Sequence, residues 1–402
     1  VVTFILSGRT GLIPILGALS ALGAASIDLY LPALPSLAEQ LTGPPGGAQF
    51  TLSAFFIGLA CSQVIYGPLS DAIGRKPVLL GGLSLFVLAS FACAAATSIP
   101  QLIGLRVLQA LGAGVGGVVA RAIVRDLYHG NQAARAQSLI NLAMLVTPLV
   151  APILGSQLLN RFGWNSIFVV LAAFGVLCML ITGFRVPESL PPQTRATIRF
   201  SQLATGYMRV LRHRHSLGCL LTGSFAFGGF FAYLAGSPFV FIEMFGIKPT
   251  HYGYLFSINV VGIMLGAFIN SHVVLQEGPL RMLRIGVAII TLGAIALLIS
   301  ALASAGFWGI VIPLFFVVGS IGMIGANAVS CTLQPFPDIA GTAAATFGFI
   351  QMMTGALVGA GIGFFYDGTV LPMALIIILM ALASLGCCLF LVGKKEPLIQ
   401  YT

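Results

Sequence analysis

The sequence predicts an all-α polytopic membrane protein with twelve transmembrane helices in two pseudo-symmetric six-helix bundles. Of its 402 residues, 58% are hydrophobic and only 7% are charged, whereas a soluble domain carries about 25% charged residues. Apolar runs of about 20 residues, long enough to span a bilayer as a helix, recur along the whole chain. One long polar stretch divides these runs six and six, and such a division is typical of a duplicated transporter.

The predicted helices follow the apolar runs in order, and each ends where charged or proline- and glycine-containing turns interrupt the run. In the first half the runs cover residues 11–37, 48–69, 78–97, 101–124, 133–159 and 164–185. In the second half they cover residues 216–242, 250–272, 282–304, 307–333, 339–365 and 370–392. We therefore expect an N-terminal bundle over residues 1–186, a cytoplasmic linker over 187–215 and a C-terminal bundle over 216–402. The second half of the linker has the pattern of a short amphipathic helix that lies on the inner membrane surface.

The formal net charge of +9 follows this topology and does not indicate a nucleic-acid surface. Lysine and arginine cluster in every second loop, and the alternate loops hold only Arg161 and Lys248. This alternation predicts cytoplasmic termini and a cytoplasmic linker, with the excess charge facing anionic lipid. The clustered basic residues are Arg75, Lys76, Arg125, Arg135, those of 185–214, Arg281, Arg284, Lys394 and Lys395.

The seven cysteines all lie in apolar runs, and no pair has the spacing of metal ligands, so we interpret them as packing residues. The five histidines lie at predicted helix ends or in loops. We expect no metal, no cofactor and no enzymatic activity. A membrane-embedded enzyme needs a cluster of catalytic side chains, and the ionisable groups inside the apolar runs are essentially Asp28 and Arg106.

Asp28 lies in the middle of the first apolar run, where ionisation costs at least ~2.5 kcal/mol. Protonation relieves that cost, so we predict that Asp28 binds and releases a proton during transport. The alternative is that Asp28 caps a helix kink or lies at the water boundary. Arg106 lies about a turn and a half inside the fourth predicted helix and needs an anionic or carbonyl partner, for which Asp28 is the nearest candidate in kind. The alternative for Arg106 is a side chain that reaches the headgroups.

Other polar residues in the apolar runs are expected to face a central substrate cavity. The first candidates are Tyr30, Gln63, Asn141, Tyr233 and Asn259, followed by Asn327 and Gln351. Aromatic residues that could add apolar surface there are Phe56, Phe227, Phe230 and Phe231. The basic pair Arg121 and Arg125, with Asp126, is expected to form a solvated or lipid-facing cluster at the inner end of the fourth helix.

The loop after the second predicted helix carries Gly67, Leu69, Asp71, Gly74, Arg75 and Lys76. Its two glycines allow close helix approach and a tight turn. With this spacing the chain resembles the major facilitator superfamily, whose hallmark there is G-x-L-x-D-x-x-G-R-K. Residues 26–35, 66–71, 74–77 and 336–343 make it similar to the twelve-helix drug:proton antiporters of the Bcr/CflA group, which act in bicyclomycin and chloramphenicol resistance.

This resemblance implies proton-coupled efflux of small amphipathic drugs by alternating access, by a monomer in a bacterial inner membrane. It associates proton coupling with Arg106, in a pattern that also holds Gln109, and so adds Arg106 to Asp28 as a residue of proton coupling. It also implies a conformational role for Gly67, Asp71, Gly74, Arg75, Pro152 and Gly155. The last two match the antiporter motif G-x-x-x-G-P-x-x-G-G, in which Thr147, Ala151 and Ser156 replace glycines. Two further functions stay open: export of a metabolite such as an amino acid or siderophore, and proton-coupled uptake.

Overall fold

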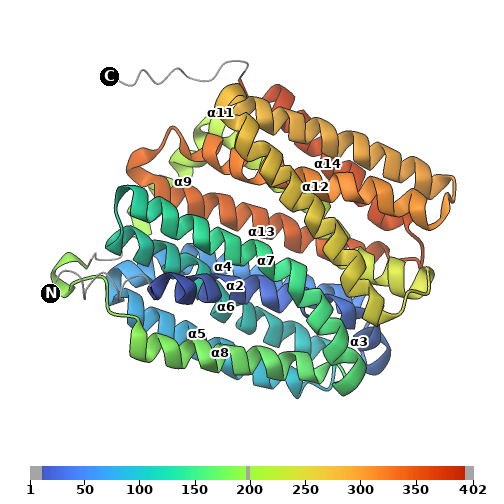
Figure 1. Cartoon of the computed structure of the whole chain (residues 1–402), viewed down its shortest axis with the longest axis horizontal. Helices are drawn as coiled ribbons and strands as arrows, with labels where there is room; N and C mark the ends of the chain where they lie inside the picture. Colours follow the sequence, from blue (N-terminus) through green and yellow to red (C-terminus); the bar gives the residue numbers. More distant parts are fainter. Residues whose placement is uncertain (1–10, 196–199, 394–402) are drawn as a thin grey trace. The chain divides into compact units, whose positions relative to one another are not determined.

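The computed structural model describes residues 11–195 and 200–393, and every regular element in these ranges is helical (Figure 1). Arg9, Arg199, Lys394 and Lys395 lie outside the described residues. In the first part of the chain the helices are α2 (Leu12–Asp28), η1 (Leu31–Ala33), α3 (Leu34–Gln40), α4 (Gly47–Ile73), α5 (Arg75–Ala94), α6 (Ile99–Leu127), α7 (Gly130–Phe162) and α8 (Asn165–Arg185). They are followed by η2 (Pro192–Thr194), α9 (Phe200–Arg212), α10 (Arg214–Pro238), η3 (Phe239–Met244), α11 (Pro249–Leu302), α12 (Gly306–Leu333), η4 (Pro337–Ile339), α13 (Ala340–Phe365) and α14 (Leu371–Phe390).

Eleven helices in the described ranges are long and apolar enough to cross a membrane. One of them, α11, has 54 residues, about twice the length that a bilayer needs. Its backbone leaves the helical region at Gly278 (φ 76°), which is followed by Pro279. This break falls between the two segments predicted at 250–272 and 282–304, so the prediction of twelve membrane segments is confirmed and the chain is a multi-pass membrane protein.

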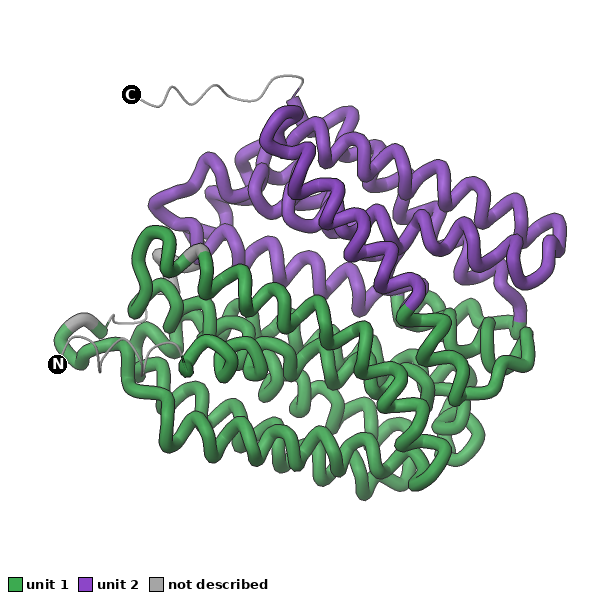
Figure 2. The backbone as a smooth tube through the Cα atoms, viewed as in Figure 1, with its two compact units in different colours: residues 1–199, 235–257, 359–368 green, residues 200–234, 258–358, 369–402 purple. Residues whose placement is uncertain are grey.

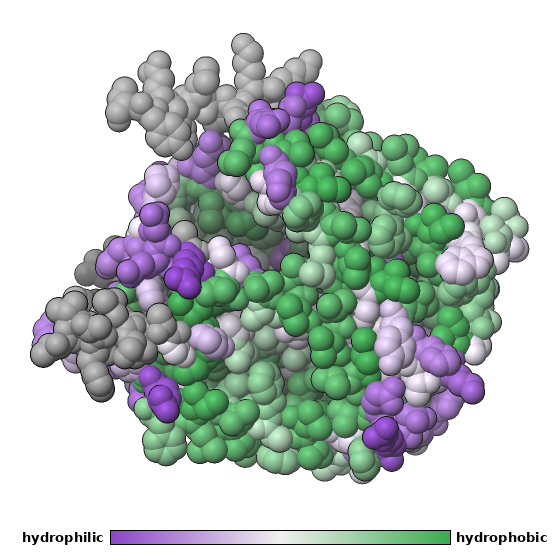
Figure 3. Space-filling view, in the orientation of Figure 1, coloured by the Kyte–Doolittle hydropathy of each residue, from purple (hydrophilic) through white to green (hydrophobic). Residues whose placement is uncertain are grey.

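The surface explains why these helices need a membrane. Large apolar side chains are exposed along the helices, among them Phe184 at 84% and Leu275 at 89%. Figure 3 shows apolar residues over most of the exposed helix faces and hydrophilic residues gathered near helix ends. Such a surface would be unfavourable in water and suits a hydrocarbon surrounding.

The first compact unit comprises residues 1–199, 235–257 and 359–368 (Figure 2). Within it, α2 packs against α6, α7 and α8, while α6 also packs against α4 and α5. The segments from later in the chain join it through close backbone contacts. A Cβ on Gly253 would lie 2.7 Å from the Cα of Ile153, and Ser257 Oγ donates a 2.7 Å hydrogen bond to the carbonyl of Leu149.

The second compact unit comprises residues 200–234, 258–358 and 369–402. It includes α9, the amphipathic helix predicted in the linker. One face of α9 contacts the turn between α12 and α13, because Arg209 pairs with Asp338 at 2.5 Å and lies over the ring of Phe336. This helix therefore has a protein partner in addition to the membrane surface that its pattern predicts. The division of the chain at residues 187–215 stays a prediction.

Candidate functional site

Asp28 is the last residue of α2, at the point where the α-helix of the first membrane segment ends before a 3-10 turn. The chain continues through Tyr30 into the 3-10 turn η1 and then into α3, with Pro32 near the start of that turn. The Asp28 side chain is 5% exposed and makes no hydrogen bond or ion pair with any other residue that the structure describes. A carboxyl group buried in this way without a counter-charge can lose its proton only at a high desolvation cost.

Arg106 on α6 is completely buried, and its guanidinium group is held from several sides. Its Nη1 and Nη2 atoms donate hydrogen bonds of 3.3 and 3.2 Å to the carbonyl of Ser26, and Nη1 donates a 2.6 Å bond to Oε1 of Gln109. The guanidinium carbon lies 4.4 Å from the ring centre of Tyr30 and 4.1 Å from that of Phe55. Hydrogen bonds and cation–π contacts therefore stabilise a cation in a fully buried site.

The partner of Arg106 is thus a carbonyl group, and the suggested pairing with Asp28 is wrong in this structure. The reason lies at the end of α2. Tyr30 N–H donates to the carbonyl of Ile27, as in a 3-10 turn, so the carbonyl of Ser26 loses the partner that a continuing α-helix would supply. Arg106 takes this free acceptor.

Gln109 extends the network to a third helix. Its Nε2 atom donates a 2.9 Å hydrogen bond to Ser90 Oγ on α5, and Ser90 donates to the carbonyl of Phe86. The two polar residues of the α6 pattern, Arg106 and Gln109, therefore connect α2, α6 and α5 through one chain of hydrogen bonds.

The predicted cavity residues lie in different surroundings. Tyr30 is fully buried and shares a 2.6 Å hydrogen bond with Thr51, so it belongs to the Arg106 cluster. Gln63 lies near Arg121, with 3.5 Å between its Oε1 and Nη2 of the arginine. Asn141 accepts a 3.0 Å hydrogen bond from Gln137. In the second unit, Asn259 donates a 3.1 Å hydrogen bond to the hydroxyl of Tyr233, and both residues are fully buried.

The loop motif between α4 and α5 forms an ion-pair cluster around Arg75, which is 2% exposed. Arg75 pairs with Asp71 at 2.5 Å, four residues earlier, and with Asp126 at 2.9 Å, on α6. Gly74 ends α4 with a φ of 114°, a conformation that favours glycine. Gly67 has no close neighbour, because a Cβ there would meet nothing within 4 Å. The predicted close approach therefore does not occur at Gly67.

Two acidic residues of this cluster were not recognised from the sequence. Asp126 was expected in a solvated group with Arg121 and Arg125, but its side chain is only 14% exposed and pairs with Arg75. Glu188 follows α8 and accepts hydrogen bonds from the backbone N–H groups of Arg75, at 2.9 Å, and Lys76, at 3.3 Å. A carboxylate at a helix start satisfies free N–H groups and the helix dipole. The only sequence signal for Glu188 was an isolated acid directly after a membrane helix.

The antiporter-like motif on α7 allows close contact with the end of α2. A Cβ on Gly155 would lie 2.1 Å from the carbonyl oxygen of Leu29, the residue after Asp28. Pro148 and Pro152 lie inside α7, and the carbonyl of Pro152 faces Gly253. The position of the Asp28 backbone therefore depends on a small residue at position 155.

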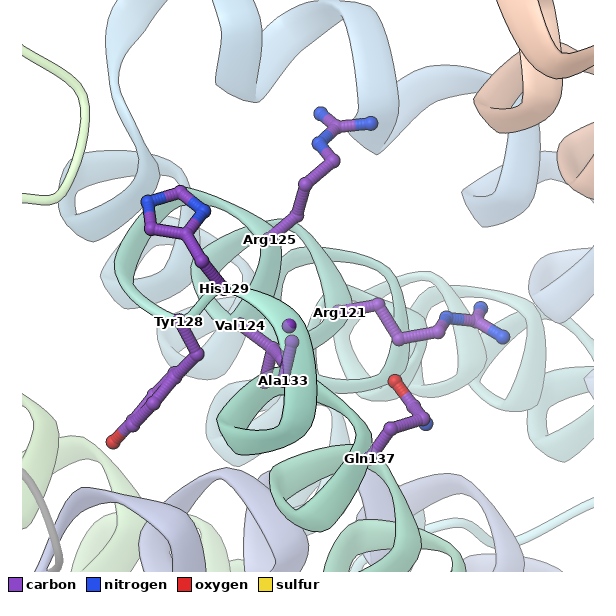
Figure 4. A pocket seen from close by; sticks show the side chains of 8 residues that line it. Arg121, Val124, Arg125, Tyr128, His129, Ala133 and Gln137 are labelled. Atoms are coloured by element: carbon purple, nitrogen blue, oxygen red, sulfur yellow. The ribbon is translucent and has the colours of Figure 1, made fainter.

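A hollow of about 440 Å³ lies at the turn from α6 to α7. In the close view, Arg121 and Gln137 extend to the same side, while Arg125, on α6, and His129, in the turn, extend in other directions (Figure 4). Its lining residues are Arg121, Val124, Arg125, Tyr128, His129, Gly130, Ala133 and Gln137. In the described part of the chain, no three histidine, cysteine or acidic side chains come together as metal ligands would.

Known proteins resemble this chain over most of its length. The profile of the Major Facilitator Superfamily matches residues 16–360. The bicyclomycin resistance protein homolog of Haemophilus influenzae is 32% identical over 373 residues, which cover 93% of this chain and 92% of that protein. Multidrug resistance protein D of Escherichia coli is 30% identical over 336 residues and 83% of each chain. The chloramphenicol resistance protein of Pseudomonas aeruginosa is 28% identical over 328 residues, which cover 81% of this chain and 77% of that protein.

Solved structures show the same fold at low sequence identity. The D-xylose-proton symporter superposes with a TM-score of 0.74 at 18% identity, covering 97% of this chain and 98% of that one. A bacterial homolog of the lysosomal transporter Spinster gives a TM-score of 0.69 at 14% identity, covering 96% and 95%. The match over residues 16–360, together with relatives above 30% identity along nearly the whole chain, leads to one conclusion. This chain is a member of the Major Facilitator Superfamily of membrane transporters.

Proposed function

We propose that this transporter exports small amphipathic drugs, such as chloramphenicol- or bicyclomycin-like compounds, in exchange for protons. The names of its relatives support drug export, since they include bicyclomycin, chloramphenicol and multidrug resistance proteins. The observation that carries proton coupling is the Asp28 carboxyl group, buried without a partner one residue before the contact between Leu29 and Gly155.

In the proposed cycle, Asp28 takes up a proton from one side of the membrane and releases it on the other. A charged carboxylate in apolar surroundings is costly, and a proton removes that charge. The loss or gain of this charge changes the relative free energies of the arrangements that the C-terminal end of α2 can adopt. This end is linked to α6 by the hydrogen bond from Arg106 and to α7 by the close contact at Gly155. Drug and proton then favour different arrangements of these helices, which is the requirement for exchange.

The energy of one proton is sufficient for useful export. Entry of one proton down ~100 mV supplies ~2.3 kcal/mol, and one pH unit adds ~1.4 kcal/mol. The sum, ~3.7 kcal/mol, sustains a gradient of several hundred-fold for a neutral drug exchanged one for one. One acid therefore suffices.

We assign the remaining predicted residues to supporting roles in this cycle. Tyr30, Gln63, Asn141, Tyr233 and Asn259 belong to the substrate cavity. Gly67, Asp71, Gly74, Arg75, Pro152 and Gly155 control the change between the two access states, with the Arg75 cluster stabilising one of them. We also propose a monomer in a bacterial inner membrane, with both termini in the cytoplasm and rocking bundles at residues 1–186 and 216–402.

Purified protein in proteoliposomes with an imposed pH gradient provides the test. Wild type should move radiolabelled chloramphenicol against its gradient only when the proton gradient is present. Asp28→Asn should still bind the drug and lose gradient-driven transport, whereas Glu39→Gln, at an exposed position on α3, should transport normally. Retained pH-driven export by Asp28→Asn would exclude Asp28 from coupling. Movement of drug in the same direction as the proton would indicate uptake instead.

A further inference from the structure

The hollow at the turn from α6 to α7 has the size of a ligand site. Its volume of about 440 Å³ lies within the range of roughly 300–1,000 Å³ that is usual for pockets that hold small molecules. Arg121 and Arg125 are four residues apart on α6, and both line the hollow. Val124 and Ala133 add apolar surface, so the lining suits an amphipathic compound.

The side chains that line the hollow are either cationic or neutral. No carboxylate is among the lining residues, and neither Arg121 nor Arg125 belongs to an ion pair in the described ranges. The nearest acid along the chain, Asp126, is engaged by Arg75 and by Ser189. Two arginines therefore present N–H donors and uncompensated positive charge to whatever occupies the hollow.

Two predicted cavity residues border this hollow. Gln63 on α4 lies beside Arg121, and Asn141 is one turn along α7 from Gln137, to which it is hydrogen-bonded. Asp28, the acid that could attract a cation, does not line the hollow and is buried. The lining of the hollow therefore offers hydrogen-bond donors and positive charge and contains no acid.

We infer that Arg121 and Arg125 select the substrates of this transporter by charge. The preferred substrates are neutral or anionic amphipathic compounds with acceptor oxygens, such as nitro, carbonyl or carboxylate groups, and lipophilic cations are excluded. This inference rests on the proposed function, because it concerns which compounds are exported. The simpler role for these arginines is to orient the chain in the membrane, which requires positive charge but no contact with substrate.

Binding of two probes to the purified full chain separates these roles. Chloramphenicol is neutral and carries nitro and carbonyl oxygens, whereas tetraphenylphosphonium is a lipophilic cation. At about 9 Å and an effective dielectric constant of about 40, each arginine weakens binding of a cation by about five-fold. Arg121→Gln/Arg125→Gln should therefore tighten tetraphenylphosphonium binding by roughly twenty-fold and weaken chloramphenicol binding.

The matched control is Arg161→Gln/Lys248→Gln, which removes two exposed charges, one at the far end of α7 and one just before α11, and should change neither affinity. Arg121→Lys/Arg125→Lys keeps the charge and should keep the exclusion of the cation, even if the glutamine variant folds poorly. Equal affinity of wild type for the two probes would overturn the inference, as would equal shifts in the Gln variant and its control. These readouts require no proton gradient, so loss of coupled transport alone would count against the proposed function and leave the charge selectivity intact.

Discussion

Arg106 of α6 donates two hydrogen bonds to the main-chain carbonyl of Ser26, two residues before Asp28. The position of the acid is therefore tied to a buried cation through the backbone and not through a salt bridge. In this arrangement Asp28 can change its charge without first breaking an ion pair. Arg106 instead holds the helix end on which Asp28 lies.

Arg106→Lys should lower the free energy of unfolding by about 2–3 kcal/mol and abolish coupled transport. Lysine keeps the charge but cannot reach the carbonyl of Ser26 with two donors while stacking between Tyr30 and Phe55. Thermal unfolding in detergent and drug transport in proteoliposomes measure the two effects. Arg121→Lys, the same exchange at an exposed site on the same helix, should leave stability unchanged. A stable and active Arg106→Lys protein would show that the network does not need a guanidinium group.

Gly155→Ala should destabilise the protein by about 1–3 kcal/mol, because the new Cβ would overlap the carbonyl of Leu29 and force α7 away from α2. Transport should fall with it, since the end of α2 would shift. Gly117→Ala on α6 is the control, because a Cβ there meets nothing within 4 Å, and it should be neutral or slightly stabilising. Comparable thermal unfolding of the two variants would contradict the close contact.

Glu188→Ala should cost about 1 kcal/mol of stability, because the N–H groups of Arg75 and Lys76 at the start of α5 would lose their acceptor. Thermal unfolding at low salt gives the size of the effect. Glu39→Ala, at an exposed site with no such contact, serves as the reference. A Glu188→Ala protein as stable as the reference would mean that water replaces the carboxylate without loss.

Tyr366 should make stability fall at alkaline pH. Burial, together with its 2.6 Å hydrogen bond to Glu243, raises the pKa of this phenol above its ordinary value. The folded chain then keeps a proton that the unfolded chain loses above about pH 10, so the folded state loses stability as the pH rises through that value. Tyr366→Phe should reduce this slope in thermal unfolding between pH 9 and 11, while Tyr254→Phe, at an exposed site, should retain it. An unchanged slope in Tyr366→Phe would assign the alkaline loss to other groups.

Several features of the fold were predictable because they depend on short stretches of sequence. The length and apolar character of each run predict a membrane helix, and the polar interruption near Gly278 predicts the two segments that α11 contains on either side of its break. The pairing of Arg75 with Asp71 was also accessible, since only four positions in the sequence separate these two opposite charges. Asp28 and Arg106 stood out because ionisable groups are rare in apolar helices.

Contacts between distant parts of the chain were not predictable in the same way. Arg75 meets Asp126 across 51 residues, and Arg209 meets Asp338 across 129 residues. No local pattern specifies either pair, because many acids and bases near helix ends could combine. The same is true of Glu188, because the N–H groups that it accepts from, at the start of α5, are far from it in the sequence.

The sequence by itself determined that this chain lies in a membrane, how many times it crosses, and which ionisable residues are buried there, since hydrocarbon tolerates only apolar helices of sufficient length. The tertiary structure decided which groups satisfy those residues. Arg106 binds a carbonyl because α2 ends at Asp28, and that end is positioned by packing against α6 and α7, which no single stretch of sequence encodes.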